Sequence, residues 1–85
     1  MKGNMNLNSW DYDELDKEMR KATPFQLLQL YKRENKKYTE KCVEYANRIG
    51  TLTPEGITVL EKECEFLNGA RIKVALKIAE ELTKS

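Results

Sequence analysis

Histidine is absent from this 85-residue chain, and its absence excludes several functions at once. Without an imidazole, the chain lacks the side chain that most often serves as a general base, a metal ligand or a pH switch. Its two serines, Ser9 and Ser85, have no histidine to activate them, and no glycine-rich motif is present that could cradle a phosphate. We therefore expect a protein that is not an enzyme and that holds no metal or cofactor.

Cysteine is scarce as well: Cys42 and Cys64 lie 22 residues apart and form no C-x-x-C motif. A structural zinc site needs four nitrogen or sulfur ligands, and a redox motif needs neighbouring thiols. The first twenty residues contain no apolar segment typical of a secretory signal, which favours the reducing cytoplasm. We expect two free thiols that pack as small hydrophobic side chains, with a disulfide between them as the alternative.

Long apolar runs and a net charge are also missing. The longest uninterrupted apolar run is Val74-Ala75-Leu76, which is far too short to span a membrane. Fifteen basic residues against fourteen acidic ones leave a charge of +1, so no overall field attracts nucleic acid or acidic lipid. An apolar fraction of 40% is typical of a soluble globular chain, and 85 residues suffice for one domain.

The chain does contain clear helix signals. Residues 1–8 have no apolar period and predict a flexible tail, which is followed by a single helical domain over residues 9–85. Ser9 can cap a first, short helix over about residues 9–22. No segment alternates with the period of two that marks a strand, so we predict an all-α protein.

A second helix is predicted over residues 24–49. Thr23 and Gln26 flank Pro24 in the pattern of a capping box, in which side chains and backbone cap each other at the helix start. Gly50 then occupies the position where a left-handed residue often ends a helix. Between these ends, the residues of one face recur every three or four positions: Leu28, Tyr31, Asn35, Tyr38, Cys42, Tyr45 and Ile49. Tyrosines at this packing period indicate a core rather than a platform for stacking bases.

A third helix is predicted over about residues 54–83, because Thr53 and Pro54 repeat the start signal. Its inner face recurs at the same spacing: Ile57, Leu60, Cys64, Leu67, Arg71, Val74 and Ile78. Asn68-Gly69 interrupts the helix-forming residues, at a cost of about 1 kcal/mol relative to alanine. Since the heptad phase is unchanged across the glycine, we predict one continuous helix, with a break at this point as the alternative.

The connection between the two long helices is so short that we expect an antiparallel, coiled-coil-like hairpin. This turn pairs positions whose numbers sum to about 106, and it places Cys42 opposite Cys64 and Asn35 opposite Arg71. With Glu34 beside Arg71, these polar residues form a predicted core polar layer that fixes the register. Arg71 extending to solvent along its own stem is the alternative.

The first helix is expected to cover only one flank of the third. The predicted contacts join two sets of residues: Leu15, Met19 and either Trp10 or Tyr12 on the first helix, and Ile72, Leu76 and Ala79 on the third. Phe66 and Val59 lie on the opposite flank, where so short a helix cannot easily reach. Together with Val43 of the second helix, they form the predicted partner-binding surface, although singly exposed apolar residues are also common.

These features predict a non-catalytic binding protein: a regulator, inhibitor or adaptor that presents a helix face to a protein partner. Two hairpins could also associate into a four-helix bundle, which predicts a homo-oligomer that hides Phe66 and Val59. The large excess of lysine over arginine is typical of AT-rich coding, which is common in phages and low-GC bacteria. We therefore expect a cytoplasmic protein of phage or mobile-element type.

Two other functions stay open. Nucleic acid could bind a basic face on the second helix, formed by Lys32, Arg33, Lys36, Lys37 and Lys41. The near-zero net charge and the length of the helices argue against a DNA-reading unit. An oligomer of hairpins could instead form a pocket between subunits that holds a small ligand such as a nucleotide.

Overall fold

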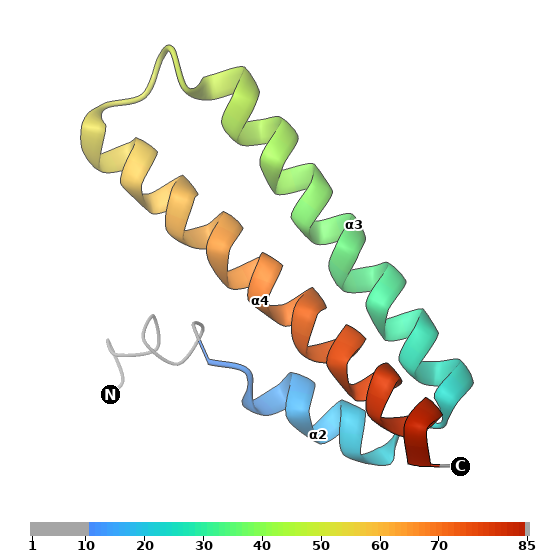
Figure 1. Ribbon diagram of the computed structural model, residues 1–85. Helices are drawn as coiled ribbons and strands as arrows, with labels where there is room; N and C mark the ends of the chain where they lie inside the picture. Colours follow the sequence, from blue (N-terminus) through green and yellow to red (C-terminus); the bar gives the residue numbers. More distant parts are fainter. Residues whose placement is uncertain (1–10, 85) are drawn as a thin grey trace.

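The computed structural model describes residues 11–84, and this range contains three α-helices: α2 (Asp13–Lys21), α3 (Pro24–Arg48) and α4 (Pro54–Lys84) (Figure 1). α3 and α4 form an antiparallel hairpin, and α2 lies against the half of the hairpin remote from the turn. No strand occurs within the described range. The predicted all-α hairpin with a short N-terminal helix is confirmed. The predicted tail, residues 1–8, lies outside the described residues.

α2 begins at Asp13, so the predicted helix start near residue 9 is wrong. Ser9 itself lies outside the described range. Tyr12 precedes the helix with φ −108° and ψ 20°, and its side chain makes no cap because its hydroxyl bonds to another helix. Asp11 helps to satisfy the helix start, since its Oδ1 accepts a hydrogen bond from the Asp13 amide at 3.2 Å.

The capping box at the start of α3 is confirmed. The Gln26 amide donates to Thr23 Oγ1 at 3.2 Å, and the Thr23 amide donates to Gln26 Oε1 at 2.9 Å. The predicted left-handed glycine cap at the other end is wrong, because no described residue has a positive φ. Instead, the amide and the hydroxyl of Thr51 both donate to the Arg48 carbonyl, at 2.9 and 3.0 Å, and Gly50 only extends the turn.

α4 is continuous through Asn68-Gly69, as predicted. The reason for the glycine is Tyr12, the residue just before α2. The Tyr12 hydroxyl donates to the Phe66 carbonyl at 2.9 Å, and the Tyr12 ring stacks on the Phe66 ring with centroids 4.5 Å apart and planes 11° apart. A Cβ on Gly69 would collide with this hydroxyl, so glycine lets the tyrosine keep its position. The glycine therefore serves packing, at the cost of some helix propensity.

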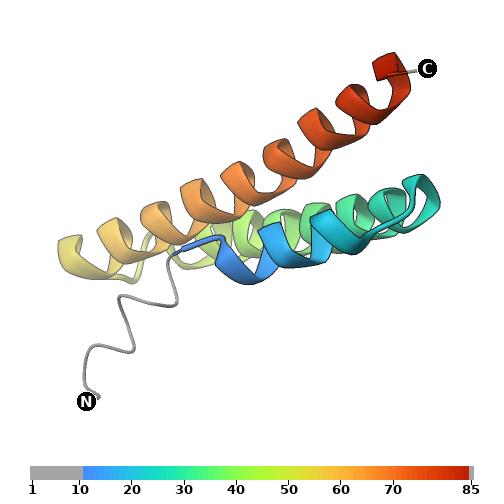
Figure 2. The same ribbon diagram turned by 90° about the horizontal axis from the view of Figure 1, so that it is seen from below.

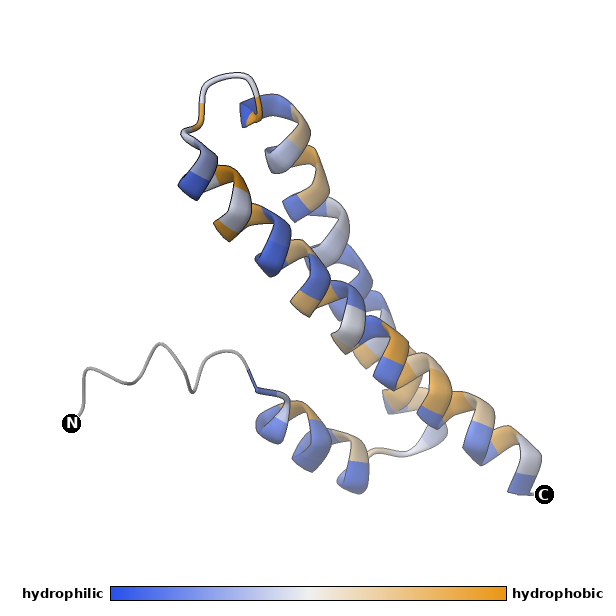
Figure 3. Ribbon diagram, turned by 60° about the vertical axis from the view of Figure 1, so that its left-hand side comes forward, coloured by the Kyte–Doolittle hydropathy of each residue, from blue (hydrophilic) through white to orange (hydrophobic). Residues whose placement is uncertain are grey.

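The main core lies where all three helices meet. Its buried side chains are Leu15 and Met19 of α2, Leu27 of α3, and Ala70 and Val74 of α4. In Figure 3, hydrophobic residues gather at this end of the hairpin, while the middle of the hairpin is mostly hydrophilic. The small side chain of Ala70, next to Gly69, lets α2 approach α4 closely.

The inner face of α3 differs from the predicted one at both of its ends. Leu27 is 1% exposed, whereas the predicted Leu28 is 49% exposed, and Ile49 at the other end is also exposed. The prediction considered only one neighbour for α3. Because α2 adds a second neighbour, the most buried line of α3 turns toward the groove between α2 and α4.

Contacts along the hairpin agree with the predicted register. Arg71 Nη1 donates to Asn35 Oδ1 at 3.2 Å, and the Tyr45 hydroxyl donates to Glu61 Oε2 at 3.0 Å. In both pairs the residue numbers sum to 106, as the length of the turn requires.

The flank of α4 that α2 covers is not the predicted one. Ile72 remains 45% exposed and Leu76 64% exposed, and Ala79 is exposed as well. α2 contacts the flank that carries Phe66 instead, and an ion pair between Lys73 Nζ and Asp16 Oδ1 at 3.3 Å fixes its middle there. Stacking an aromatic ring on Phe66 removes more apolar area from water than covering isolated aliphatic residues would.

The packing of Tyr12 on Gly69 predicts an unusual response to alanine. Alanine in place of glycine normally raises helix stability by about 1 kcal/mol, but Gly69→Ala should not show this gain, because the displaced Tyr12 hydroxyl loses its hydrogen bond and part of its stacking. Gly50→Ala should raise the free energy of unfolding by about 0.5 kcal/mol, because a Cβ there meets no atom within 4 Å. Urea denaturation followed by circular dichroism measures both changes. A gain of about the full 1 kcal/mol from Gly69→Ala would contradict this packing.

Candidate functional site

The predicted partner-binding surface is not an open patch. Phe66 is half-buried beneath the Tyr12 ring, so the expectation that the N-terminal helix cannot reach it is wrong. Tyr12 reaches Phe66 because its long side chain extends from the residue just before α2. Val59 and Val43 do remain exposed, but on different helices. The stacking removes the largest side chain from the surface that we predicted.

The predicted basic face on α3 is divided between two sides of the helix. Residues 33, 37 and 41 follow each other at intervals of four and therefore share one side, where each meets a carboxylate. Lys32 and Lys36 lie on another side and are exposed. The sequence pattern counted charges along α3 but could not include the acidic residues that α2 and α4 bring to it.

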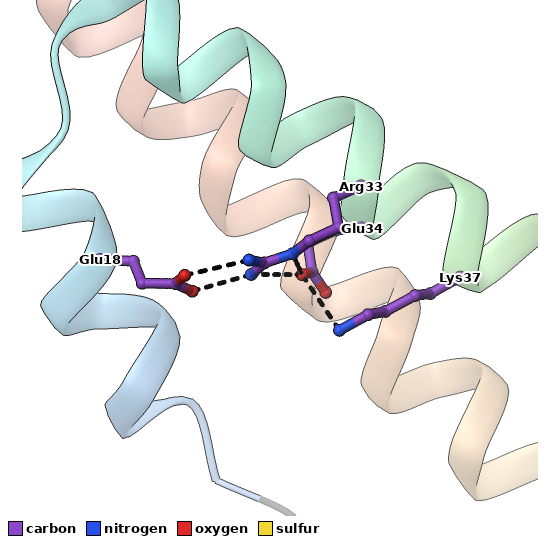
Figure 4. A network of polar contacts seen from close by, with 4 residues as sticks. All are labelled: Glu18, Arg33, Glu34 and Lys37. Carbon is purple, nitrogen blue, oxygen red and sulfur yellow. Dashed lines mark hydrogen bonds and ion pairs between the residues drawn. The ribbon is translucent and has the colours of Figure 1, made fainter.

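A charge cluster connects α2 to α3 (Figure 4). The Arg33 guanidinium holds the Glu18 carboxylate with two hydrogen bonds of 2.8 and 3.0 Å, and its Nε donates to Glu34 Oε2 at 2.8 Å. Lys37 Nζ adds an ion pair to the same Glu34 oxygen at 3.5 Å. Hydrogen bonds from Arg33 lower the pKa of Glu18, and the bonds to Glu18 raise the pKa of Arg33.

Glu34 is the buried polar residue of this cluster, with only 5% of its side chain exposed. We predicted it beside Arg71 in the core polar layer, but its ion pairs are with Arg33 and Lys37 of its own helix. A carboxylate at such a site needs a fixed cation, which the guanidinium supplies. The cluster therefore serves to hold α2 on the hairpin.

The rest of the core polar layer forms as predicted. Arg71 bonds Asn35 across the hairpin and Asn68 on its own helix, the latter through Nε at 2.8 Å. Its guanidinium also lies over the Tyr38 ring, 4.3 Å from the centroid. Three partners hold Arg71 inside the hairpin seam, so the alternative in which it extends to solvent does not apply.

The open end of the hairpin carries an apolar hollow of about 290 Å³ between the start of α3 and the end of α4. Figure 2 shows the two helices diverging toward this end. We call it the open-end hollow, and its lining residues are Pro24, Phe25, Leu27, Leu28, Ile78, Glu81 and Leu82. Phe25 is 67% exposed and Leu82 is exposed as well, which places large apolar side chains at the rim.

We did not predict the open-end hollow from the sequence, although a usable signal was present. Extending the register to the helix ends pairs Leu28 with Ile78 and Phe25 with Leu82, since the numbers again sum to about 106. The only charged lining residue, Glu81, already pairs with Lys77 at 3.4 Å and Lys84 at 3.2 Å. The hollow thus presents apolar side chains and no free charge.

The described residues offer little for other kinds of site. Within residues 11–84, no group of three or more acidic or cysteine side chains is placed to hold a metal ion. None of the three helices is both long and apolar enough to cross a bilayer. Neither a model of a known protein family, nor a curated protein, nor a solved structure matches this chain.

The burial of Glu34 predicts a large effect of removing its cation. Arg33→Met should lower the free energy of unfolding by about 2 kcal/mol, because the carboxylate loses its closest partner and α2 loses its tie. Changing Glu34 to Met in the same protein should recover most of that loss. Lys32→Met, which removes an exposed cation next in sequence, should change stability by less than about 0.5 kcal/mol. Urea denaturation measures the free energy of unfolding of each variant. If Arg33→Met and Lys32→Met lowered it equally, this role for Arg33 would be refuted.

Acid should weaken the tie between α2 and α3. Because the folded pKa of Glu18 is lowered from its ordinary value of 4.5, the folded protein binds this proton less readily than the unfolded chain. The stabilisation is therefore complete above the unfolded pKa and is lost as the pH falls through the lowered folded pKa. We expect the stability difference between the wild type and Glu18→Gln to be largest at neutral pH and to shrink below pH 4.5. A difference that grows in acid would have the wrong sign.

Proposed function

We propose that the protein is a non-catalytic binding module that recognises another polypeptide through the open-end hollow, as a regulator, inhibitor or adaptor. The observation that carries this proposal is a hollow lined almost entirely by apolar side chains, with Phe25 and Leu82 exposed at its rim. Clustered large apolar residues at a protein surface commonly mark contacts with other proteins. Aromatic residues such as Phe25 are also enriched at the centre of such interfaces.

The chemistry of the hollow favours a partner that contributes apolar side chains. A volume of about 290 Å³ is at the low end of ligand pockets, and the hollow offers no converging polar groups to orient a nucleotide. An amphipathic helix can instead place one or two large side chains between α3 and α4. We therefore propose a helical segment of a partner protein as the occupant.

A second copy of the chain is the competing occupant. Two open-end hollows could face each other across a twofold axis, which would give the predicted homo-oligomer. The lysine-rich composition and the free thiols are consistent with a cytoplasmic protein of phage or mobile-element type. The homo-oligomer and the cytoplasmic, phage-type origin are both parts of the proposal.

Binding of nucleic acid is less well supported. Arg33, Lys37 and Lys41 are already in ion pairs, so binding phosphate there would first break contacts within the protein. This leaves Lys32 and Lys36, which are too few cations for a strong phosphate contact.

Phe25→Glu tests the proposal. The change places a carboxylate in the first turn of α3, where the helix dipole favours it, so the fold should persist. We expect the affinity for the partner to fall at least about tenfold, as for a residue at the centre of an interface. Leu76→Glu is the matched control, because Leu76 is similarly exposed (64%) but lies outside the hollow.

Affinity capture from source cells and light scattering separate the occupants. A protein retained by the wild type and by Leu76→Glu, but not by Phe25→Glu, supports a partner protein. A dimer mass that falls only in Phe25→Glu indicates a second copy instead. If both variants behave as the wild type in both measurements, the open-end hollow is not the binding site. Retention of nucleic acid that is lost in Lys32→Glu with Lys36→Glu would favour the basic residues.

A further inference from the structure

Cys42 of α3 and Cys64 of α4 lie opposite each other in the middle of the hairpin. The Tyr45–Glu61 hydrogen bond lies three residues away from each cysteine and fixes the register there. Lys41 and Glu63, the neighbours of the two cysteines, also pair across the hairpin, with Nζ and Oε1 3.3 Å apart. These two contacts fix the register of α3 against α4, and in this register Cys42 and Cys64 face each other.

The two cysteines are also open to small reagents. Both line one hollow of about 400 Å³ on the surface of the hairpin, and both are only half-buried. Burial and the neighbouring thiol of Cys42 raise the pKa of the Cys64 thiol. Cys42 thus lies close enough to Cys64 to affect its ionisation.

Packed helices have the right spacing for a covalent bond between such a pair. Helix axes in contact are about 8–10 Å apart, and Cα atoms lie about 2.3 Å from each axis. Cα atoms that face each other directly are therefore separated by roughly 3.4–5.4 Å, and the upper part of this range overlaps the separation of about 4.4–6.8 Å that disulfides require. Packed helices can therefore accommodate a disulfide between facing residues.

We propose that Cys42 and Cys64 are a redox-sensitive dithiol that closes to an inter-helix disulfide when the protein meets a peroxide. One thiol loses its proton, and the resulting thiolate attacks a peroxide oxygen, which gives a sulfenic acid and a hydroxide that takes up the released proton to become water. The second thiol then attacks the sulfenic sulfur, and a second water leaves as the disulfide forms. Two thiols and one hydrogen peroxide thus give one disulfide and two waters, and an added dithiol reductant restores the thiols.

The disulfide would clamp the part of the hairpin that α2 does not cover. Polar contacts join the helices there, among them the Lys41–Glu63 ion pair and the Tyr45–Glu61 hydrogen bond. A covalent link in this region would limit how far α3 and α4 can separate. It leaves the open-end hollow unblocked, so this proposal does not depend on the proposed function.

Peroxide treatment of the purified protein tests the dithiol. We expect the intact mass to fall by two hydrogen atoms, both cysteines to stop reacting with a maleimide, and the chain to remain monomeric on a non-reducing gel. The melting temperature should rise by roughly 10 °C and should return to its original value with dithiothreitol. Cys42→Ser and Cys64→Ser, the matched controls, should show no such rise.

Three results would overturn the proposal. The first is covalent dimers in place of an internal link, and the second is a mass increase from oxygen added to separate thiols. The third is two thiols that still react with maleimide after peroxide has been applied. All three are read on the wild-type protein, so they do not depend on whether the serine variants fold.

Discussion

The register of α3 against α4 is the constraint on which the rest of the structure depends. A turn of a few residues sets it, and the Asn35–Arg71 and Tyr45–Glu61 contacts hold it along the hairpin. The same alignment brings Phe25 near Leu82 at the open end and Cys42 near Cys64 in the middle. A shift of one helical turn, about 5.4 Å, would separate each of these pairs.

A hairpin of two helices has two grooves, and α2 covers only one of them. Tyr12 and the charge cluster around Arg33 fix α2 from opposite ends, one through stacking and one through paired hydrogen bonds. The apolar side chains at the open end are left at the surface, and they form the open-end hollow on which the proposed function rests. The fold and the proposed site thus both follow from the shortness of α2, which cannot cover both grooves of the hairpin.

Much of this architecture follows from local rules, and the parts that do not are informative. Capping at Thr23 and the heptad spacing predict the long helices and their pairing, because both depend on residues close in sequence. The groove that α2 occupies could not be predicted, since Leu15 and Met19 fit an apolar strip on either side. Contact between Tyr12 and Gly69 determines which groove α2 occupies. These residues are 57 positions apart, and a periodic pattern does not reveal that their shapes fit together.

The charged residues give the same lesson. The sequence shows five cations on α3 but not which carboxylates approach them in space, so the basic face looked more available than it is. Glu34 looked like a partner for Arg71 because the two are near in register. Arg33 is closer, and its planar guanidinium can bind two carboxylates at once.

The uneven placement of the core has a consequence for motion. The cluster of buried apolar side chains lies around Leu27 and Val74. Of the residues that the structure describes near the turn, Leu60 alone is a buried apolar residue. We therefore expect backbone amides close to the turn to exchange with solvent through local opening of the helix ends, and those around Val74 to exchange more slowly.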